Sequence, residues 1–297
     1  MSPALTRLFA TTVQILFVLA PTIAWSQMTN TSISTGREDG NYYFIGERLQ
    51  TKMTMEHSYR IAVETSSGSV QNLARLADPS SDVGLALTQS DALSRFLQSN
   101  SEFGKEFIVL GDAGKECVVL ISARKGGIRT FSELKSSSGA EISVDDPGSG
   151  ASATFDYLVA MDPALASTKP VFVDTMEALL QIKVAGAHTK LEAAMLVQRP
   201  SMRSPAVSIV LQNPRDYQLV PILESDVQNS KLPDDSVVYT FEKVRVGSSN
   251  PNGGIPVDTI CTRSLLLASK GKLDREIRSK LSLMMLESSK DVIGNGD

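Results

Sequence analysis

The chain has 297 residues, of which 42% are hydrophobic and 21% are charged, with a formal net charge of −4. It contains no basic block of the kind that marks nucleic-acid binding, so a nucleic-acid partner is not expected. The length exceeds one typical hydrophobic core, and two lobes are therefore expected.

The first segment has the features of an export signal. Arg7 is the only charged residue before position 37, an apolar run follows it, and Ala24-Trp25-Ser26 has the small-x-small pattern of a cleavage site. We expect cleavage after Ser26 and a soluble, exported mature protein. The alternative is an uncleaved anchor, because the run is only just long enough to span a bilayer. Cleavage leaves 28 basic and 33 acidic residues, a net charge of −5, and no tryptophan.

Short apolar runs alternate with helical patterns along the rest of the chain. Strands are predicted at residues 58–65, 82–89, 117–123 and 141–144, and helices at residues 69–77, 90–98, 131–135, 152–161 and 272–289. The helix at 69–77 would place Val70, Leu73 and Leu76 on one face. Strands that alternate with helices favour parallel sheets in an α/β fold. The polar stretches at 136–139 and 248–254 are expected to be surface loops.

Three segments share one construction, in which a strand ends in a small-residue turn and a helix begins. They are STGREDGNYY (34–43), ETSSGSVQN (64–72) and SVDDPGSGASATF (143–155). Glycine lets the backbone approach a ligand closely, hydroxyls cap the helix and donate hydrogen bonds, and a helix start favours an anion. Because ligands of open α/β sheets bind beyond the carboxyl ends of strands, the three turns together indicate a small-anion cleft. Taken singly, Ser69 or Ser149 could be a plain helix cap.

The same stretches resemble a known family. STGREDGNYYFIGERL, ETSSGSVQNLARLADPSSDVGLALTQSDAL and GIRTFSELKSSSGAEISVDDPGSGASATFDYLV are similar to the TAXI-type solute receptors of TRAP transporters. The similarity covers most of residues 30–165 and continues faintly through 257–269. It implies a periplasmic binding protein of the two-lobed type II fold, with a hinge and an inter-lobe ligand cleft. After the signal peptide at 1–26, lobe 1 would comprise 27–118 and 258–297, and lobe 2 would comprise 119–257.

The resemblance also implies a ligand site, matched residue by residue. Its members would be Thr35, Gly36 and Tyr43 in a first loop, Thr65, Ser66, Gly68 and Ser69 in a second, Gln89, Ser90 and Asp91 in a third, and Gly148, Ser149, Gly150 and Ser152 in the anion-holding turn of the other lobe. An aromatic lid, hydroxyls and two helix starts could then enclose a carboxylate-bearing metabolite as the lobes close.

Two regions depart from the family's pattern: residues 37–39, and the region near Gln198 and Arg199, where a small residue that the family often has is missing. Arg37, Glu38 and Asp39 stand where small or neutral residues are usual. Arg37 could pair with a substrate carboxylate, whereas Glu38 and Asp39 would favour an amino group or a cation. All three could instead point to solvent from the rim of a loop. Arg199 could be a further carboxylate partner or a surface residue.

The two cysteines, Cys117 and Cys261, lack metal-ligand spacing. In an oxidising compartment they could form a disulfide, and the alternative is two separately buried thiols. Under the lobes implied by the resemblance, both cysteines lie close to adjacent chain crossovers, which supports a pairing.

The sequence lacks a catalytic constellation. His57 and His188 have no ligand-like neighbour at helical spacing, GSGAS is not a nucleophile elbow, and GDAGKE is not a phosphate-binding loop. Asp145 is expected to order the turn before Pro147. We therefore expect no enzyme activity, metal or cofactor.

The expected function is an exported receptor that delivers a small carboxylated metabolite, an amino acid, dicarboxylate or keto acid, to TRAP membrane subunits. One alternative is a binding module without transport, such as a ligand sensor or a secreted antigen. A second alternative is an enzyme on the same fold.

Overall fold

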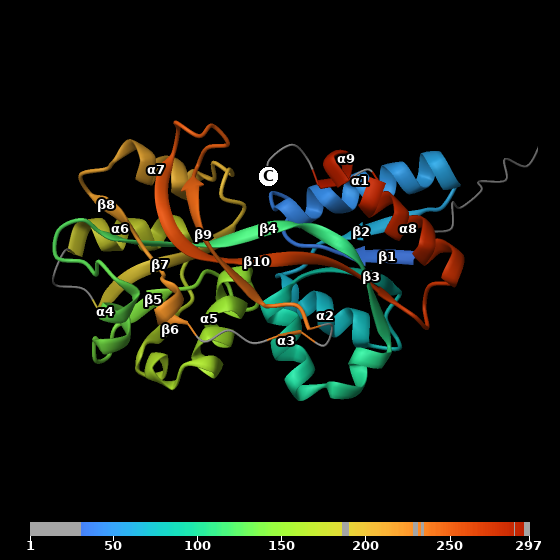
Figure 1. Ribbon diagram of the computed structural model, residues 1–297, viewed down its shortest axis with the longest axis horizontal. Coiled ribbons are helices and arrows are strands. Elements are labelled where there is room, and N and C mark those ends of the chain that lie inside the picture. The colour runs from blue at the N-terminus through green and yellow to red at the C-terminus, as the bar shows by residue number, and fades with distance from the viewer. Residues whose placement is uncertain (1–30, 186–189, 228–230, 233–234, 288, 294–297) are drawn as a thin grey trace, which may run out of the picture.

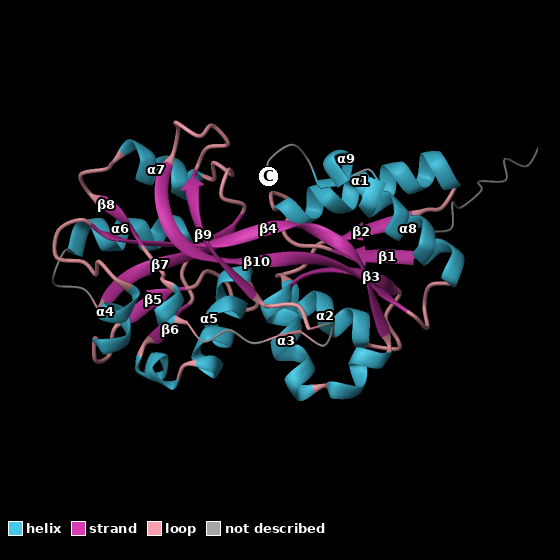
Figure 2. Cartoon of the chain, viewed as in Figure 1, coloured by secondary structure: helices cyan, strands magenta, loops and turns pink. Residues whose placement is uncertain are grey.

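The computed structural model describes residues 31–185, 190–227, 231–232, 235–287 and 289–293. The predicted signal peptide at 1–26 and His188 lie outside the described residues. Within the described part, ten strands form one mixed sheet in the order β2-β1-β3-β10-β4-β7-β5-β6, with β8 against β4 and β9 against β10. Helices cover both faces of this sheet, which curves through two lobes joined at the centre (Figure 2).

The lobe that contains the first strands is built on parallel pairing. Its elements in chain order are β1 (Thr31–Ser34), α1 (Asn41–His57), β2 (Ile61–Glu64), α2 (Ser69–Ala77), β3 (Val83–Gln89), α3 (Ser90–Ser99) and the 3-10 turn η1 (Ser101–Lys105). The last helices, α8 (Arg275–Glu287) and α9 (Ser289–Ile293), return to this lobe. β1 lies between β2 and β3 and is parallel to both.

Two long strands run through both lobes (Figure 1). β4 (Phe107–Ala123) and β10 (Ile255–Ser269) are antiparallel partners along most of their length. β4 pairs with β7 and β8 in the second lobe, whereas β10 pairs with β3 in the first. The expectation of parallel sheets is therefore wrong for the centre of the molecule. The chain crosses between the lobes in opposite directions on these two strands, so they must be antiparallel.

The second lobe holds the elements between the two crossings. They are α4 (Phe131–Ser136), β5 (Glu141–Ser143), α5 (Gly150–Met161), η2 (Pro163–Ser167), β6 (Lys169–Val171), α6 (Thr175–Ala185), β7 (Leu191–Gln198), α7 (Pro205–Gln212), β8 (Tyr217–Val220), η4 (Glu224–Asp226) and β9 (Tyr239–Val246). β5 is parallel to β6 and β7, and β9 forms an antiparallel hairpin with β10.

Three apolar clusters make the core. One lies under α1 and α8 and includes Ile45 and Leu281, and another fills the second lobe. The third joins the lobes, because Leu93 of α3 and Phe155 of α5 belong to the same buried cluster. Burial of one large apolar side chain contributes about 1.5–3 kcal/mol, so contacts of this kind favour the closed arrangement seen here.

Most predicted elements form where the sequence placed them. The helix predicted at 69–77 is α2, and α3, α4, α5 and α8 lie within two or three residues of their predicted bounds. The strand predicted at 58–65 is shorter, because Ser58 ends α1 in the left-handed conformation with φ 52°. The predicted face of α2 is wrong at Val70, which is 44% exposed while Leu73 and Leu76 are buried.

The structure joins Cys117 and Cys261 in a disulfide. The two residues are direct partners in the β4–β10 register, where β4 also begins to pair with β7 and β10 also pairs with β9. The alternative of two separate thiols is therefore wrong. The bridge ties together two strands that are far apart in the sequence and that form the connection between the lobes.

Candidate functional site

The predicted loops follow the carboxyl ends of four strands. Residues 35–36 follow β1, residues 65–68 follow β2, α3 begins directly after β3, and residues 144–149 follow β5. The starts of α2, α3 and α5 lie near one another at the junction of the lobes (Figure 1). Two of these turns are in direct contact, since a Cβ added at Gly68 would lie 2.5 Å from the carbonyl oxygen of Gly148.

Glycine is required at Gly68 for two reasons. Its φ of +140° and ψ of −160° belong to a region that is essentially restricted to glycine, and Gly148 packs against it from the other lobe. Gly150, at the start of α5, lies against another loop of the first lobe. A Cβ there would lie 3.0 Å from Nε2 of Gln89. These contacts bring the second, third and fourth predicted loops together.

The side chain of Gln89 is the group at this junction whose hydrogen bonds are unfilled. The residue is 1% exposed, yet neither its amide nitrogen nor its amide oxygen has a hydrogen-bond partner within the described part of the chain. A buried polar group without a partner costs about 1–3 kcal/mol. The Gln89 amide is therefore an unsatisfied donor and acceptor beside the start of α5.

A second polar group surrounds this amide on the side of the first lobe. Ser69 Oγ accepts a hydrogen bond of 3.0 Å from the backbone N–H of Gln89, and Ser264 is the Cα partner of Gln89 across the β3–β10 pair. The Tyr42 hydroxyl donates to Oε2 of Glu116 at 3.2 Å and lies 3.3 Å from Oγ of Ser264. The group thus continues from Gln89 to the central strand β4.

Burial dominates the electrostatics of this group. Removal from water raises the pKa of Glu116 to about 7, an effect that hydrogen bonds from Ser264 and Tyr42 and the charge of Arg199 partly offset. Burial, followed by the nearby Glu116 charge, raises the pKa of Tyr42 well above its ordinary value. Tyr42 is therefore a neutral donor, and Glu116 changes its protonation near neutral pH.

Tyr42, Glu116 and Ser264 are absent from the sequence-based site. A signal for Tyr42 was present, because the buried positions of α1 recur at helical spacing from Tyr42 through Ile45 and Leu49. Tyr43, the predicted aromatic lid, is only partly buried and packs edge-on against Phe44 at 6.5 Å. The role of Tyr43 as a lid remains a prediction. Glu116 had no comparable local signal, since its burial arises from strand pairing.

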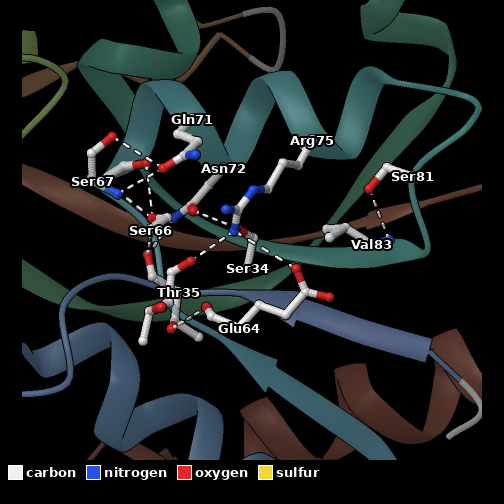
Figure 3. Close-up of polar contacts among 12 residues, drawn as sticks. Ser34, Thr35, Glu64, Ser66, Ser67, Gln71, Asn72, Arg75, Ser81 and Val83 are labelled. Carbon is white, nitrogen blue, oxygen red and sulfur yellow. Dashed lines mark hydrogen bonds and ion pairs between the residues drawn. The ribbon is translucent and has the colours of Figure 1, made fainter.

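Hydroxyls of the first two loops mainly hold the backbone (Figure 3). Thr35 Oγ1 donates to the Glu64 carbonyl at 2.8 Å, and Ser66 Oγ donates to the Thr35 carbonyl at 3.2 Å. The N–H of Gly68 in turn donates to Ser66 Oγ at 3.0 Å. These bonds shape the turn whose glycine meets the other lobe.

Two residues of α2 complete this framework in Figure 3. The Asn72 amide donates to the backbone carbonyls of Thr35 and Leu87, thereby joining the ends of β1 and β3. Arg75 donates to the carbonyl of Thr65 at 2.7 Å, while the Thr65 side chain itself is exposed. Gly36, between Thr35 and the charged rim, is buried.

The charged residues of the first loop form the rim. Arg37, Glu38 and Asp39 are exposed, which matches the solvent-facing alternative, and they line an open surface hollow of about 640 Å³. Nε of Arg37 lies 3.3 Å from Asp39, and NH1 of Arg37 lies 4.0 Å from Asp146 of the other lobe. Exposed pairs of this kind contribute about 0–1 kcal/mol.

Ser149 and Ser152 form the cap of α5. Ser149 Oγ accepts from the N–H of Ser152 at 3.2 Å and donates to the carbonyl of Val144 at 2.9 Å. Ser149 thus has the helix-cap role, which orients the start of α5 toward the first lobe. The Ser152 hydroxyl accepts a long bond of 3.4 Å from the N–H of Gly148.

Arg199 follows β7 and is buried, so the surface alternative is wrong for this residue. Its guanidinium donates to the carbonyl of Ile293 at 2.6 Å and to that of Ala113 at 3.4 Å. It thereby links the second lobe to α9 and to β4, and its charge reaches Glu116.

Ser90 and Asp91 are also fully buried. Ser90 Oγ lies 2.7 Å from Oγ1 of Thr262, and Asp91 accepts from Thr154 Oγ1 at 2.6 Å and from the Tyr239 hydroxyl at 3.0 Å. Burial raises the pKa of Asp91, and these hydrogen bonds oppose the increase.

Over the described residues, no group of three or more His, Cys, Asp or Glu side chains has the arrangement of a metal site. In the same part of the chain, no helix combines the length and the apolar character needed to cross a membrane.

Two solved structures with a similar fold are a periplasmic thiamin binding protein and XAC2383 from Xanthomonas citri bound to ATP. The first is 12% identical and covers 90% of this chain and 81% of its own, with a TM-score of 0.52. The second is 11% identical and covers 89% and 88%, also with a TM-score of 0.52. At these identities the likeness shows the fold, which is the two-lobed fold of periplasmic binding proteins. No curated protein matches the chain.

The family comparison covers both lobes and the loops between them. The model of the NMT1-like family matches residues 33–290, from β1 to α9, and the match includes all the predicted site residues. The chain therefore belongs to the NMT1-like family.

Proposed function

We propose that this chain is a periplasmic solute receptor that captures a small carboxylated metabolite between its lobes and delivers it to TRAP membrane subunits. The observation that carries the proposal is the buried Gln89 amide, which has no hydrogen-bond partner among the described residues and lies beside the start of α5 at the junction of the lobes. The two-lobed fold and the membership of the NMT1-like family support a binding role.

A carboxylate suits this position for a physical reason. The N–H of Ser152 donates to the Ser149 cap, whereas the N–H groups of Gly150 and Ala151 at the start of α5 and the Gln89 amide N–H could donate to an anion, and the helix dipole favours negative charge there. The Gln89 amide oxygen and the hydroxyl of Ser69, which accepts from the Gln89 backbone N–H, could contact other polar groups of the metabolite. On binding, the ligand would exchange its bound water for these fixed hydrogen-bond donors, and no covalent bond would form.

The boundaries of the two proposed lobes lie in the strands that cross between them, β4 and β10. Residues 27–118 and 258–297 would move as one body and residues 119–257 as the other, with the hinge in β4 and β10 beside the Cys117–Cys261 bridge. Closure would bring Gly148 against Gly68 and seal the ligand.

The test begins with a thermal-shift screen of the mature protein, residues 27–297, against amino acids, dicarboxylates and keto acids, with and without calcium. An extrinsic dye is needed because the mature chain has no tryptophan. A ligand at a hundred times its dissociation constant should stabilise the protein by about 2.7 kcal/mol. TRAP coupling is then tested by uptake of the hit in vesicles that contain the membrane subunits.

The matched variants are Gln89→Leu and, as control, Gln98→Leu on the exposed side of α3. Gln89→Leu should weaken binding of the hit at least tenfold, because a hydrogen bond to a charged group contributes about 1.5–3 kcal/mol. It should not lower the melting temperature of the free protein, since it removes a buried amide that has no partner in the described part of the chain. Unchanged affinity in Gln89→Leu would refute the assignment of this site.

A further inference from the structure

Three consecutive residues at the junction of β3 and α3, Gln89, Ser90 and Asp91, have different surroundings, although the sequence suggests one role for all of them. The Gln89 side chain lacks partners within the described residues, and Ser90 is bonded to the carbonyl of Val238 and to Thr262. Asp91 differs from both, because its two carboxylate oxygens accept bonds from three elements. The residue that a ligand could contact is thus separated by one position from a residue that is already engaged.

The bonds of Asp91 join the two lobes. Oδ1 accepts from the N–H of Ala92 at 2.8 Å within α3, and Oδ2 accepts from Thr154 of α5 at 2.6 Å and from Tyr239 of β9 at 3.0 Å. Asp91, Thr154 and Tyr239 are each at most 1% exposed. The carboxylate therefore has no face left for a ligand while the lobes are in this arrangement.

Separation of the lobes would break the bonds that the Asp91 carboxylate accepts from Thr154 and Tyr239. The Ala92 bond is local to α3 and would persist, whereas Thr154 lies on a helix of the second lobe. The ring of Tyr157, also on α5, packs edge-on against Tyr239 at 5.5 Å, so the two donors belong to one packed unit. Hydrogen bonds to a carboxylate are stronger than those between neutral groups, so their loss should shift a closing equilibrium measurably.

We propose that Asp91 is a positioning residue, the acceptor of an inter-lobe latch with Thr154 and Tyr239, and not a ligand contact. The latch sets the fraction of molecules that are closed and so scales the affinity for any ligand held between the lobes. This inference rests on the proposed function only in that closure accompanies capture. The latch consists of bonds between residues of this chain, so it can be tested without a ligand.

The experiment measures closure in the ligand-free mature protein by pulsed electron paramagnetic resonance. Spin labels are placed at Met55 on α1 and Leu180 on α6, which are 79% and 61% exposed, through a non-natural amino acid that spares the disulfide. The variants are Thr154→Val, which removes the hydroxyl at constant shape, Tyr239→Phe, and Thr154→Ser, which keeps the donor.

Thr154→Val and Tyr239→Phe should each lengthen the inter-label distance in a larger share of molecules, with a fall of about tenfold in the closed-to-open ratio for Thr154→Val. Thr154→Ser should give the distance distribution of the unmodified protein. Distributions unchanged in both Thr154→Val and Tyr239→Phe would overturn the latch, as would an equal shift in Thr154→Ser. Because no ligand is used, this result is independent of the Gln89→Leu binding test.

Discussion

The contact between Gly68 and Gly148 leads to a sharp prediction for Gly68→Ala. The added Cβ would lie 2.5 Å from the Gly148 carbonyl oxygen, whereas ordinary contact begins at 3.4 Å, so the two turns must separate by about 1 Å. Relaxation within the turn is limited, because the local hydrogen bonds to Ser66 define its backbone. The φ of +140° adds strain of about 1–3 kcal/mol in both states.

The clash penalises only the closed state, so Gly68→Ala should move the ligand-free protein toward longer distances between labels at Met55 and Leu180. It should also weaken binding of any hit from the screen at least tenfold, because destabilising the closed state by about 1.4 kcal/mol is sufficient for that change. Gly139→Ala is the matched control, since its φ is +73° and a Cβ there would meet no atom within 4 Å. It should lower the melting temperature and leave closure unchanged. A closed fraction in Gly68→Ala equal to that of Gly139→Ala would refute the reasoning.

Three further predictions concern the hinge, the buried acid and the rim. Replacement of Cys117 and Cys261 by serine should lower the free energy of unfolding by about 2–5 kcal/mol in urea titrations, and a loss below 1 kcal/mol would contradict a structural role. Burial raises the pKa of Glu116 from 4.5 to about 7, so its contribution to stability is present below pH 4.5 and is lost as the pH rises toward 7. Between pH 4.5 and 7 the free energy of unfolding should fall by about 3 kcal/mol relative to that of Glu116→Gln. Parallel pH profiles of the two proteins would count against this prediction. Arg37→Ala should change the melting temperature little, because the pairs of Arg37 with Asp39 and Asp146 are exposed. A fall of more than about 1 kcal/mol in the free energy of unfolding would show that these pairs contribute more than exposed pairs do.

Local sequence signals were sufficient for the turns and for the helices that follow them. The starts of α2 and α5 depend on glycine, serine and the few residues beside them, and such turn chemistry acts within four or five positions. The same signals placed the candidate loops at strand ends, where the structure also has them. Their convergence on one junction depended on the fold implied by the resemblance.

The roles of single residues within those loops depended on tertiary contacts. Tyr42 and Tyr43 are adjacent tyrosines that the sequence alone does not distinguish. The packing of α1 against the core places Tyr42 on the buried face of the helix, where its hydroxyl donates to Glu116. Gln89 and Asp91 look equally suited to a ligand, yet the packing of α5 fills the bonds of one and leaves the other without partners among the described residues.

The sequence by itself determined the alternation of strands and helices from β2 to α5, the C-terminal helix α8, the turns that begin α2 and α5, and the resemblance that implies two lobes. Only the tertiary structure decided that β4 and β10 cross antiparallel, that Cys117 meets Cys261, and that Glu116 is buried. The physical reason is range: backbone preferences and caps act over a few residues, whereas burial and bonding between side chains depend on which distant strands pair.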